Sequence, residues 1–213
     1  NKGSFMKHFL YTITRWILNI VFFKIFHLHV EGRENIPVKG AVIVAPNHKS
    51  NWDPPLIGVA FSNRVVHYMA KEELFKNPIA AWILTMFGTF PVKRGSGDGS
   101  AVMRAVRELR KGYPVGIFPE GTRIKREGLG RFHSGMASIA MIEGTDILPV
   151  AVVGSLNMPH PKQHPAVLIG KIIHVEKQKP TKESIQALNE KVKSAIEQLM
   201  TDYNAVSYTH LTL

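Results

Sequence analysis

A chain of 213 residues is long enough for one well-buried domain and short for two. Hydrophobic residues make up 45% of it, which excludes wholesale disorder, and the absence of cysteine excludes disulfides, thiolate metal sites and a cysteine nucleophile. The formal net charge of +11 indicates a negatively charged partner: nucleic acid, anionic lipid or a phosphorylated small molecule. A basic surface that only favours solubility is the plain alternative.

The amino-terminal segment, residues 5–26, is the most hydrophobic stretch of the sequence. Arg15, Asn19 and Lys24 interrupt it, so it is a poor spanning helix, which needs about twenty nearly uncharged residues. Polar residues at helical spacing leave a wide apolar face, a pattern typical of a helix lying in a membrane interface. A signal peptide and a helix packed on its own domain are the alternatives. The segment over residues 1–29 is therefore predicted to be an amphipathic membrane anchor.

After residue 30, short apolar runs alternate with stretches that indicate helices, the last of them amphipathic. The runs that predict buried strands are 41–45, 64–70, 115–118, 147–153 and 167–175. The stretches that predict helices are 54–61, a segment interrupted near residue 78, 100–111, 134–142 and 181–203. This alternation indicates a single α/β domain with a largely parallel central sheet flanked by helices. We expect the domain to cover residues 30–204, followed by a tail of unknown role over 205–213.

The first candidate site directly follows the strand predicted at 41–45. His48 and Asp53 would point about 140° apart on a straight helix, so pairing them requires a turn, and the polar residues between them favour one. The carboxyl ends of strands are where α/β sheets bind ligands. A carboxylate that accepts one imidazole N–H leaves the other ring nitrogen free to take a proton from a hydroxyl. The alternatives without catalysis are that Asp53 caps a helix and that His48 is a polar loop residue.

The second candidate cluster follows the strand predicted at 115–118. Gly121 permits a tight turn, and Arg123 can make a two-pronged contact with a phosphate. A structural ion pair between Glu120 and Arg123 is the alternative. A third basic group, Lys93 and Arg94, ends the apolar run that begins at residue 82.

Taken in this order, the pieces resemble the glycerolipid acyltransferase family, in particular its bacterial 1-acyl-glycerol-3-phosphate acyltransferases. Asn47-His48-x-Ser50-x-x-Asp53 resembles the first block of that family, and residues 88–94 resemble the second. Residues 118–123, with the sequence FPEGTR, match the third block in every position. Residues 148–150 resemble the fourth block, and residues 70–75 resemble a further segment of the family. The resemblance covers residues 30–175, which is most of the chain.

The resemblance implies transfer of a fatty acyl group from acyl-CoA or acyl carrier protein to the sn-2 hydroxyl of 1-acyl-glycerol-3-phosphate. The product would be phosphatidic acid for phospholipid biosynthesis, and no covalent enzyme intermediate would form. His48 would act as the general base, and Asp53 would orient it. The substrate-binding set implied by the family comprises Lys71, Arg94, Glu120, Gly121, Thr122 and Arg123. Within it, Lys71, Arg94 and Arg123 would hold the acceptor phosphate, while Glu120 would fix the geometry of its loop.

The same resemblance implies lipid partners and a membrane location. The partners would be a lysophospholipid, an acyl thioester and an anionic membrane surface, with no nucleic acid, no metal and no cofactor. The chain would sit on the cytoplasmic face of the cell membrane as a peripheral or monotopic protein. Candidates for contact with the acyl chain are Trp82, Met86 and Phe87, for which core packing is the alternative.

Other classes of protein explain the sequence less well. A metal-dependent hydrolase that used His48 and Asp53 as ligands would need further ligands, but there is no His-Glu-x-x-His motif and no second close His/Asp cluster. A non-enzymatic basic membrane-binding protein would explain the charge and the amphipathic segment, but not the two polar loops at strand ends. The stronger competitor is a sister acyltransferase that acts on another lysolipid.

Overall fold

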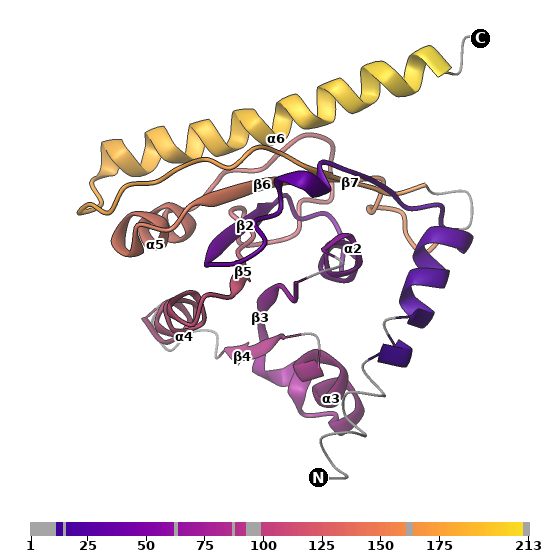
Figure 1. Cartoon of the computed structure of the whole chain (residues 1–213), viewed down its shortest axis with the longest axis horizontal. Coiled ribbons are helices and arrows are strands. Elements are labelled where there is room, and N and C mark those ends of the chain that lie inside the picture. Colours follow the sequence, from indigo (N-terminus) through magenta and orange to yellow (C-terminus); the bar gives the residue numbers. More distant parts are fainter. Residues whose placement is uncertain are drawn as a thin grey trace.

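The computed structural model describes residues 12–14, 16–61, 64–86, 88–92, 99–160 and 164–210. Seven strands form one sheet in the order β1-β7-β6-β2-β5-β3-β4 (Figure 1). The pairing of β6 with β7 is antiparallel, and every other strand pairing is parallel. The predicted fold class, a single α/β domain with a largely parallel sheet flanked by helices, is therefore confirmed.

Five of the strands lie where the apolar runs predict them. The strands are β1 (His29–Glu31), β2 (Val42–Pro46), β3 (His67–Lys71), β4 (Phe90–Val92), β5 (Pro114–Gly116), β6 (Ile147–Val153) and β7 (Ala166–Ile169). β1 and β4, with three residues each, lie outside the predicted runs. The strand expected over 167–175 ends at Ile169, although the Gly170 amide still donates to the Pro149 carbonyl at 2.9 Å and Ile173 forms an isolated bridge with Ile147.

The helices follow the predicted helical stretches closely, apart from the end of the last one. They are α2 (Asp53–Ala60), α3 (Pro78–Met86), α4 (Gly99–Arg110), α5 (Ser134–Glu143) and α6 (Lys182–His210). α6 continues past the expected end at Tyr203, since neither glycine nor proline follows before His210. Residues 205–210 of the predicted tail are thus part of this helix.

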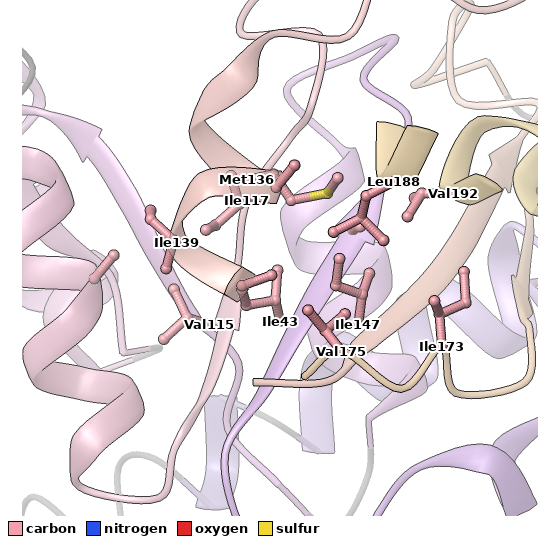
Figure 2. Packing of buried hydrophobic residues seen from close by; sticks show 14 of the residues in the cluster. Ile43, Val115, Ile117, Met136, Ile139, Ile147, Ile173, Val175, Leu188 and Val192 are labelled. Carbon is pink, nitrogen blue, oxygen red and sulfur yellow. The ribbon is translucent and has the colours of Figure 1, made fainter. Parts of the chain in front are cut away.

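Each face of the sheet has its own hydrophobic core. On one face α4, α5 and α6 cover strand residues such as Ile43, Val115 and Ile147 (Figure 2). On the other face α2 and the segment around Phe22 cover residues such as Val44. The apolar run of β2 is continuous and not alternating because both of its faces are buried.

The strand order brings the two candidate loops together. β2 lies between β5 and β6, and Val44 of β2 stands opposite Gly116 of β5. The chain leaves β2 through α2 on one face to reach β3, and it leaves β5 through α5 on the other face to reach β6. In α/β sheets, a crevice forms at the carboxyl ends of two neighbouring parallel strands when their connections run to opposite faces of the sheet. The loops after β2 and β5 therefore face each other at that edge.

The amino-terminal segment packs on the domain with one side only. Residues 12–14 and 16–20 are helical and run into a π-helix, Val21–Ile25. Phe22 is fully buried in the core beside α2, whereas Trp16 is 65% exposed and Ile17 48% exposed. Arg15, which belongs to the predicted polar stripe, lies outside the described residues. Across the described ranges, no helix combines the length and the apolar character needed to cross a membrane.

Candidate active site

The Asp53 carboxylate is the centre of the turn that follows β2. It is fully buried, and its Oδ2 accepts hydrogen bonds from His48 Nδ1 at 2.8 Å, the Lys49 amide at 2.7 Å and the Ser50 amide at 2.8 Å. Its Oδ1 accepts a bond from the Ser155 hydroxyl at 2.5 Å. Four donors thus satisfy one buried charge, and they fix the carboxylate against the imidazole.

The alternative that Asp53 caps a helix is wrong. Asp53 is the first residue of α2, and its side chain bonds amides that precede the helix, not amides inside it. Pro54 and Pro55 follow at the start of the helix and carry no N–H, so this helix has fewer free amides to cap. The carboxylate is therefore available to the turn and to His48.

The imidazole of His48 is held on two sides. Because a carboxylate only accepts, its bond to Asp53 places the proton of the neutral ring on Nδ1. The ring also stacks on Phe118, with 3.9 Å between centroids and 24° between planes. No described residue forms a hydrogen bond with Nε2. The neutral ring thus presents an unprotonated nitrogen with a fixed direction, as a general base requires.

Glu120 joins the two loops. Its buried carboxylate accepts the His48 amide at Oε2 and the Gly130 amide at Oε1, both at 2.6 Å. The Ile124 amide donates to the His48 carbonyl at 2.8 Å in the opposite direction. Glu120 therefore fixes the backbone on which His48 stands and the loop that runs toward α5.

Arg123 does not form the ion pair with Glu120 that a structural role would require. Its guanidinium is exposed and donates to Asn51 Oδ1 at 2.9 Å, and among the ion pairs of the described residues none links it to Glu120. Gly121 has φ +64°, and a Cβ there would come within 3.2 Å of the His133 ring, so this turn favours glycine. Thr122 is exposed beside Arg123.

The structure does not place the other expected side chains. Arg94, Lys93 and Phe87 lie outside the described residues, and Lys71 and Met86 are described through their backbone only. Trp82 is 39% exposed on α3, so it is not ordinary core. The described site is therefore His48, Asp53 and Glu120, with Arg123 attached through Asn51.

Two residues have supporting roles that the sequence did not predict. Ser155 lies 102 residues from Asp53, and a lone serine after a strand carries no signal. Asn47 is part of the first family block, but its role is structural. It donates to the Val152 carbonyl at 2.9 Å and accepts the Val152 amide at 2.7 Å, which continues the pairing of β2 with β6 beyond the strand.

Two further side chains next to the site have shifted pKa values. Burial raises the pKa of Tyr68 well above its ordinary value, and the charge of Asp53 adds to the rise. Its ring stacks on Phe118 and fills the place where a Cβ at Gly116 would stand, so it supports the ring that supports His48. Burial lowers the pKa of Lys49, although Glu120 and Asp53 oppose that change.

This arrangement could support proton transfer next to an exposed cationic side chain. A hydroxyl placed at His48 Nε2 can lose its proton to the ring, because Asp53 stabilises the imidazolium that forms. Arg123 stands on the loop next to that turn as an exposed cation. In the part of the chain that the structure describes, no three His, Asp or Glu side chains are grouped to hold a metal ion.

Comparisons with known proteins agree with this chemistry. Residues 27–153 match the family model described as acyltransferase. The chain is 35% identical to 1-acyl-sn-glycerol-3-phosphate acyltransferase of Borreliella burgdorferi over 60% of this chain and 52% of that protein. It is 33% identical to lyso-ornithine lipid O-acyltransferase of Pseudomonas aeruginosa over 66% of this chain and 53% of that protein. The chain thus spans about half the length of both curated relatives.

A solved structure has the same architecture. The crystal structure of the 1-acyl-sn-glycerophosphate (LPA) acyltransferase PlsC from Thermotoga maritima superposes with a TM-score of 0.72 at 26% sequence identity. The superposition covers 94% of this chain and 83% of that one. The likeness in fold therefore extends over most of this chain.

Proposed function

Because the chain belongs to the acyltransferase family, we propose that it transfers a fatty acyl group from a thioester to the sn-2 hydroxyl of 1-acyl-glycerol-3-phosphate. The product is phosphatidic acid. The observation that carries the proposal is the His48–Asp53 pair in the loop after β2, next to the exposed Arg123 of the loop after β5. The names of relatives such as the Borreliella burgdorferi and Thermotoga maritima proteins support this acceptor.

In the proposed reaction, His48 Nε2 takes the proton of the acceptor hydroxyl while the oxygen attacks the thioester carbonyl. The tetrahedral intermediate then collapses, the carbon–sulfur bond breaks, and the imidazolium returns the proton to the leaving thiolate. Asp53 holds Nδ1–H throughout and stabilises the imidazolium. Acyl-CoA or acyl carrier protein serves as co-substrate. One side chain takes up the proton and returns it, so the proposed mechanism needs no cofactor.

One assay tests this function. The purified chain is given acyl-CoA or acyl carrier protein thioester together with a panel of lysolipids, and thiol release is followed. We expect lysophosphatidic acid to be the fastest acceptor. Absence of transfer to every acceptor from both donors would contradict the proposal.

A lyso-ornithine lipid is the second candidate acceptor. The 33% identity to the Pseudomonas aeruginosa enzyme supports it, because the same base chemistry serves any acceptor hydroxyl. Faster transfer to a lyso-ornithine lipid than to lysophosphatidic acid would favour this candidate.

We expect Arg123→Ala to weaken binding of the acceptor. Arg123 is part of the proposed phosphate site with Lys71 and Arg94, and a hydrogen bond to a charged group contributes about 1.5–3 kcal/mol. The KM for lysophosphatidic acid should rise about tenfold or more, while the KM for acyl-CoA changes little. Asn51→Ala is the control, since it removes the neutral partner and keeps the guanidinium. Equal losses for both substrates together with a lower Tm would assign Arg123 a structural role only.

The proposal places the protein on the cytoplasmic face of the membrane, with the segment over residues 1–29 as its anchor. Trp16, Ile17 and Ile25 expose apolar surface there, at 65%, 48% and 54%. Deleting the whole segment would also remove the buried Phe22 and Phe26, so point substitutions are the cleaner test.

We expect the double substitution of Trp16 and Ile17 by glutamate to reduce co-sedimentation with anionic phospholipid vesicles. Both side chains are exposed, so the Tm should stay near that of the parent. Anchoring by insertion plus charge also predicts that high salt releases the parent protein only in part. Val38→Glu, at a site 93% exposed elsewhere, is the matched control and should bind vesicles normally. Complete release of the parent by salt would contradict insertion.

A further inference from the structure

A cavity of about 740 Å³ lies outside the proposed acceptor site. Its walls are the loop over residues 126–134, the first turn of α5 and the amino-terminal half of α6, which begins beside α5 (Figure 1). The volume falls within the range of small-molecule sites. Arg123 is not among its lining residues.

The cavity is strongly basic. The cationic side chains that line it are Arg126, Arg131, Lys182 and Lys193, against the single acid Glu190. Arg126, Arg131 and Lys182 take part in none of the ion pairs of the described residues, and Lys193 approaches Glu197 only at 3.9 Å. The first residue of α5 also lies in the wall, and no side chain caps that helix end, so its positive end adds to the field. The site therefore suits a ligand with several negative charges.

The lining also has an apolar part. The half-buried ring of Phe132, with Leu129 and Ile185, offers a surface against which a flat aromatic base can pack. Multiple unpaired cations beside an aromatic ring fit a nucleotide that carries several phosphates. A lipid headgroup with one phosphate would need fewer cations and no ring.

The cavity is joined directly to the catalytic turn. Gly130 in its wall donates to the Glu120 carboxylate, which also holds the His48 amide. His133 lines the cavity, packs its ring next to Gly121 and donates its amide to the Pro119 carbonyl. In coenzyme A a long, flexible arm connects the nucleotide to the thiol, so a nucleotide seated beside this loop would leave the thiol free to extend toward His48.

We propose that this cavity binds the phosphate-bearing nucleotide of coenzyme A when acyl-CoA is the donor. The inference rests on the proposed acyl transfer and adds a place for the carrier of the acyl group. The acceptor phosphate lies at Arg123, and the donor nucleotide lies between the 126–134 loop and α6. The two substrates thereby approach His48 from separate sites.

The test is the double variant Arg131→Ala, Lys182→Ala, examined by isothermal titration calorimetry with coenzyme A. Loss of two charged contacts should weaken coenzyme A binding about tenfold or more. The variant and the parent should transfer acyl groups at the same rate from acyl-pantetheine, which lacks the nucleotide. In steady state the KM for acyl-CoA should rise by a similar factor, with the KM for lysophosphatidic acid unchanged. Lys191→Ala is the matched control, because Lys191 is exposed on α6 but does not line the cavity.

Three outcomes would overturn the inference. Unchanged coenzyme A affinity in the double variant would show that the cavity does not hold the nucleotide. A raised KM for lysophosphatidic acid alone would assign the cavity to the acceptor phosphate. A loss confined to acyl carrier protein donors would make it a protein-docking surface. Failure of the parent to transfer acyl groups would count against the proposed function instead, while calorimetry with coenzyme A still tests the cavity.

Discussion

Replacing His48 with alanine should lower kcat by about 10²–10⁴-fold, the usual contribution of a positioned acid–base group. The substitution removes the nitrogen that takes the proton, whereas the backbone bonds of residue 48 to Glu120 and Ile124 remain. The Tm should therefore change little. Steady-state turnover with acyl-CoA and lysophosphatidic acid, together with thermal unfolding, checks both parts.

The structure supplies a matched control for this variant. His174 donates from Nδ1 to Asp146 Oδ2 at 2.9 Å, which is the same kind of pair at almost the same distance, but its side chain is exposed and lies outside the proposed site. His174→Ala should leave kcat unchanged. Near-normal turnover by His48→Ala would end the proposed mechanism.

Asp53→Asn should lower kcat by about 10²–10⁴-fold without a comparable loss of stability. An amide oxygen can still accept from His48 and the two amides, and the Ser155 hydroxyl can rotate to accept from the new NH₂ group. The network therefore survives, while the charge that stabilises the imidazolium is lost. Measuring kcat and Tm together separates the two effects.

Asp53→Ala is the informative comparison. It leaves the four donors that surround the Asp53 carboxylate without an acceptor, and each unsatisfied buried group costs about 1–3 kcal/mol. This variant should lose both activity and several degrees of Tm, whereas Asp53→Asn should lose activity alone. A destabilised Asp53→Asn with normal kcat would mean that Asp53 serves the turn and not the chemistry.

The sequence was most informative where the signal is local. The apolar run of β2, the amphipathic pattern of α4 and the boundaries of β6 follow from the local order of apolar and polar side chains, which depends on neighbouring residues only. The pairing of His48 with Asp53 is equally local, since five residues and one turn contain it. The alternative that Asp53 caps a helix also came from a local pattern, and it is wrong. Helix starts are recognised from short patterns, and such a pattern does not show which amides the carboxylate will meet.

The contacts between distant parts of the chain were decided by the tertiary structure alone. Periodicity gives the strands but not their order, and the order places β2 next to β5, so that Glu120 reaches the His48 amide across 72 residues. The same order brings Ser155 to Asp53 across 102 residues. The basic cavity exists only because α6 packs beside the loop at 126–134. A sequence pattern records which face of an element is apolar, but which element covers that face depends on the free energy of packing the whole chain.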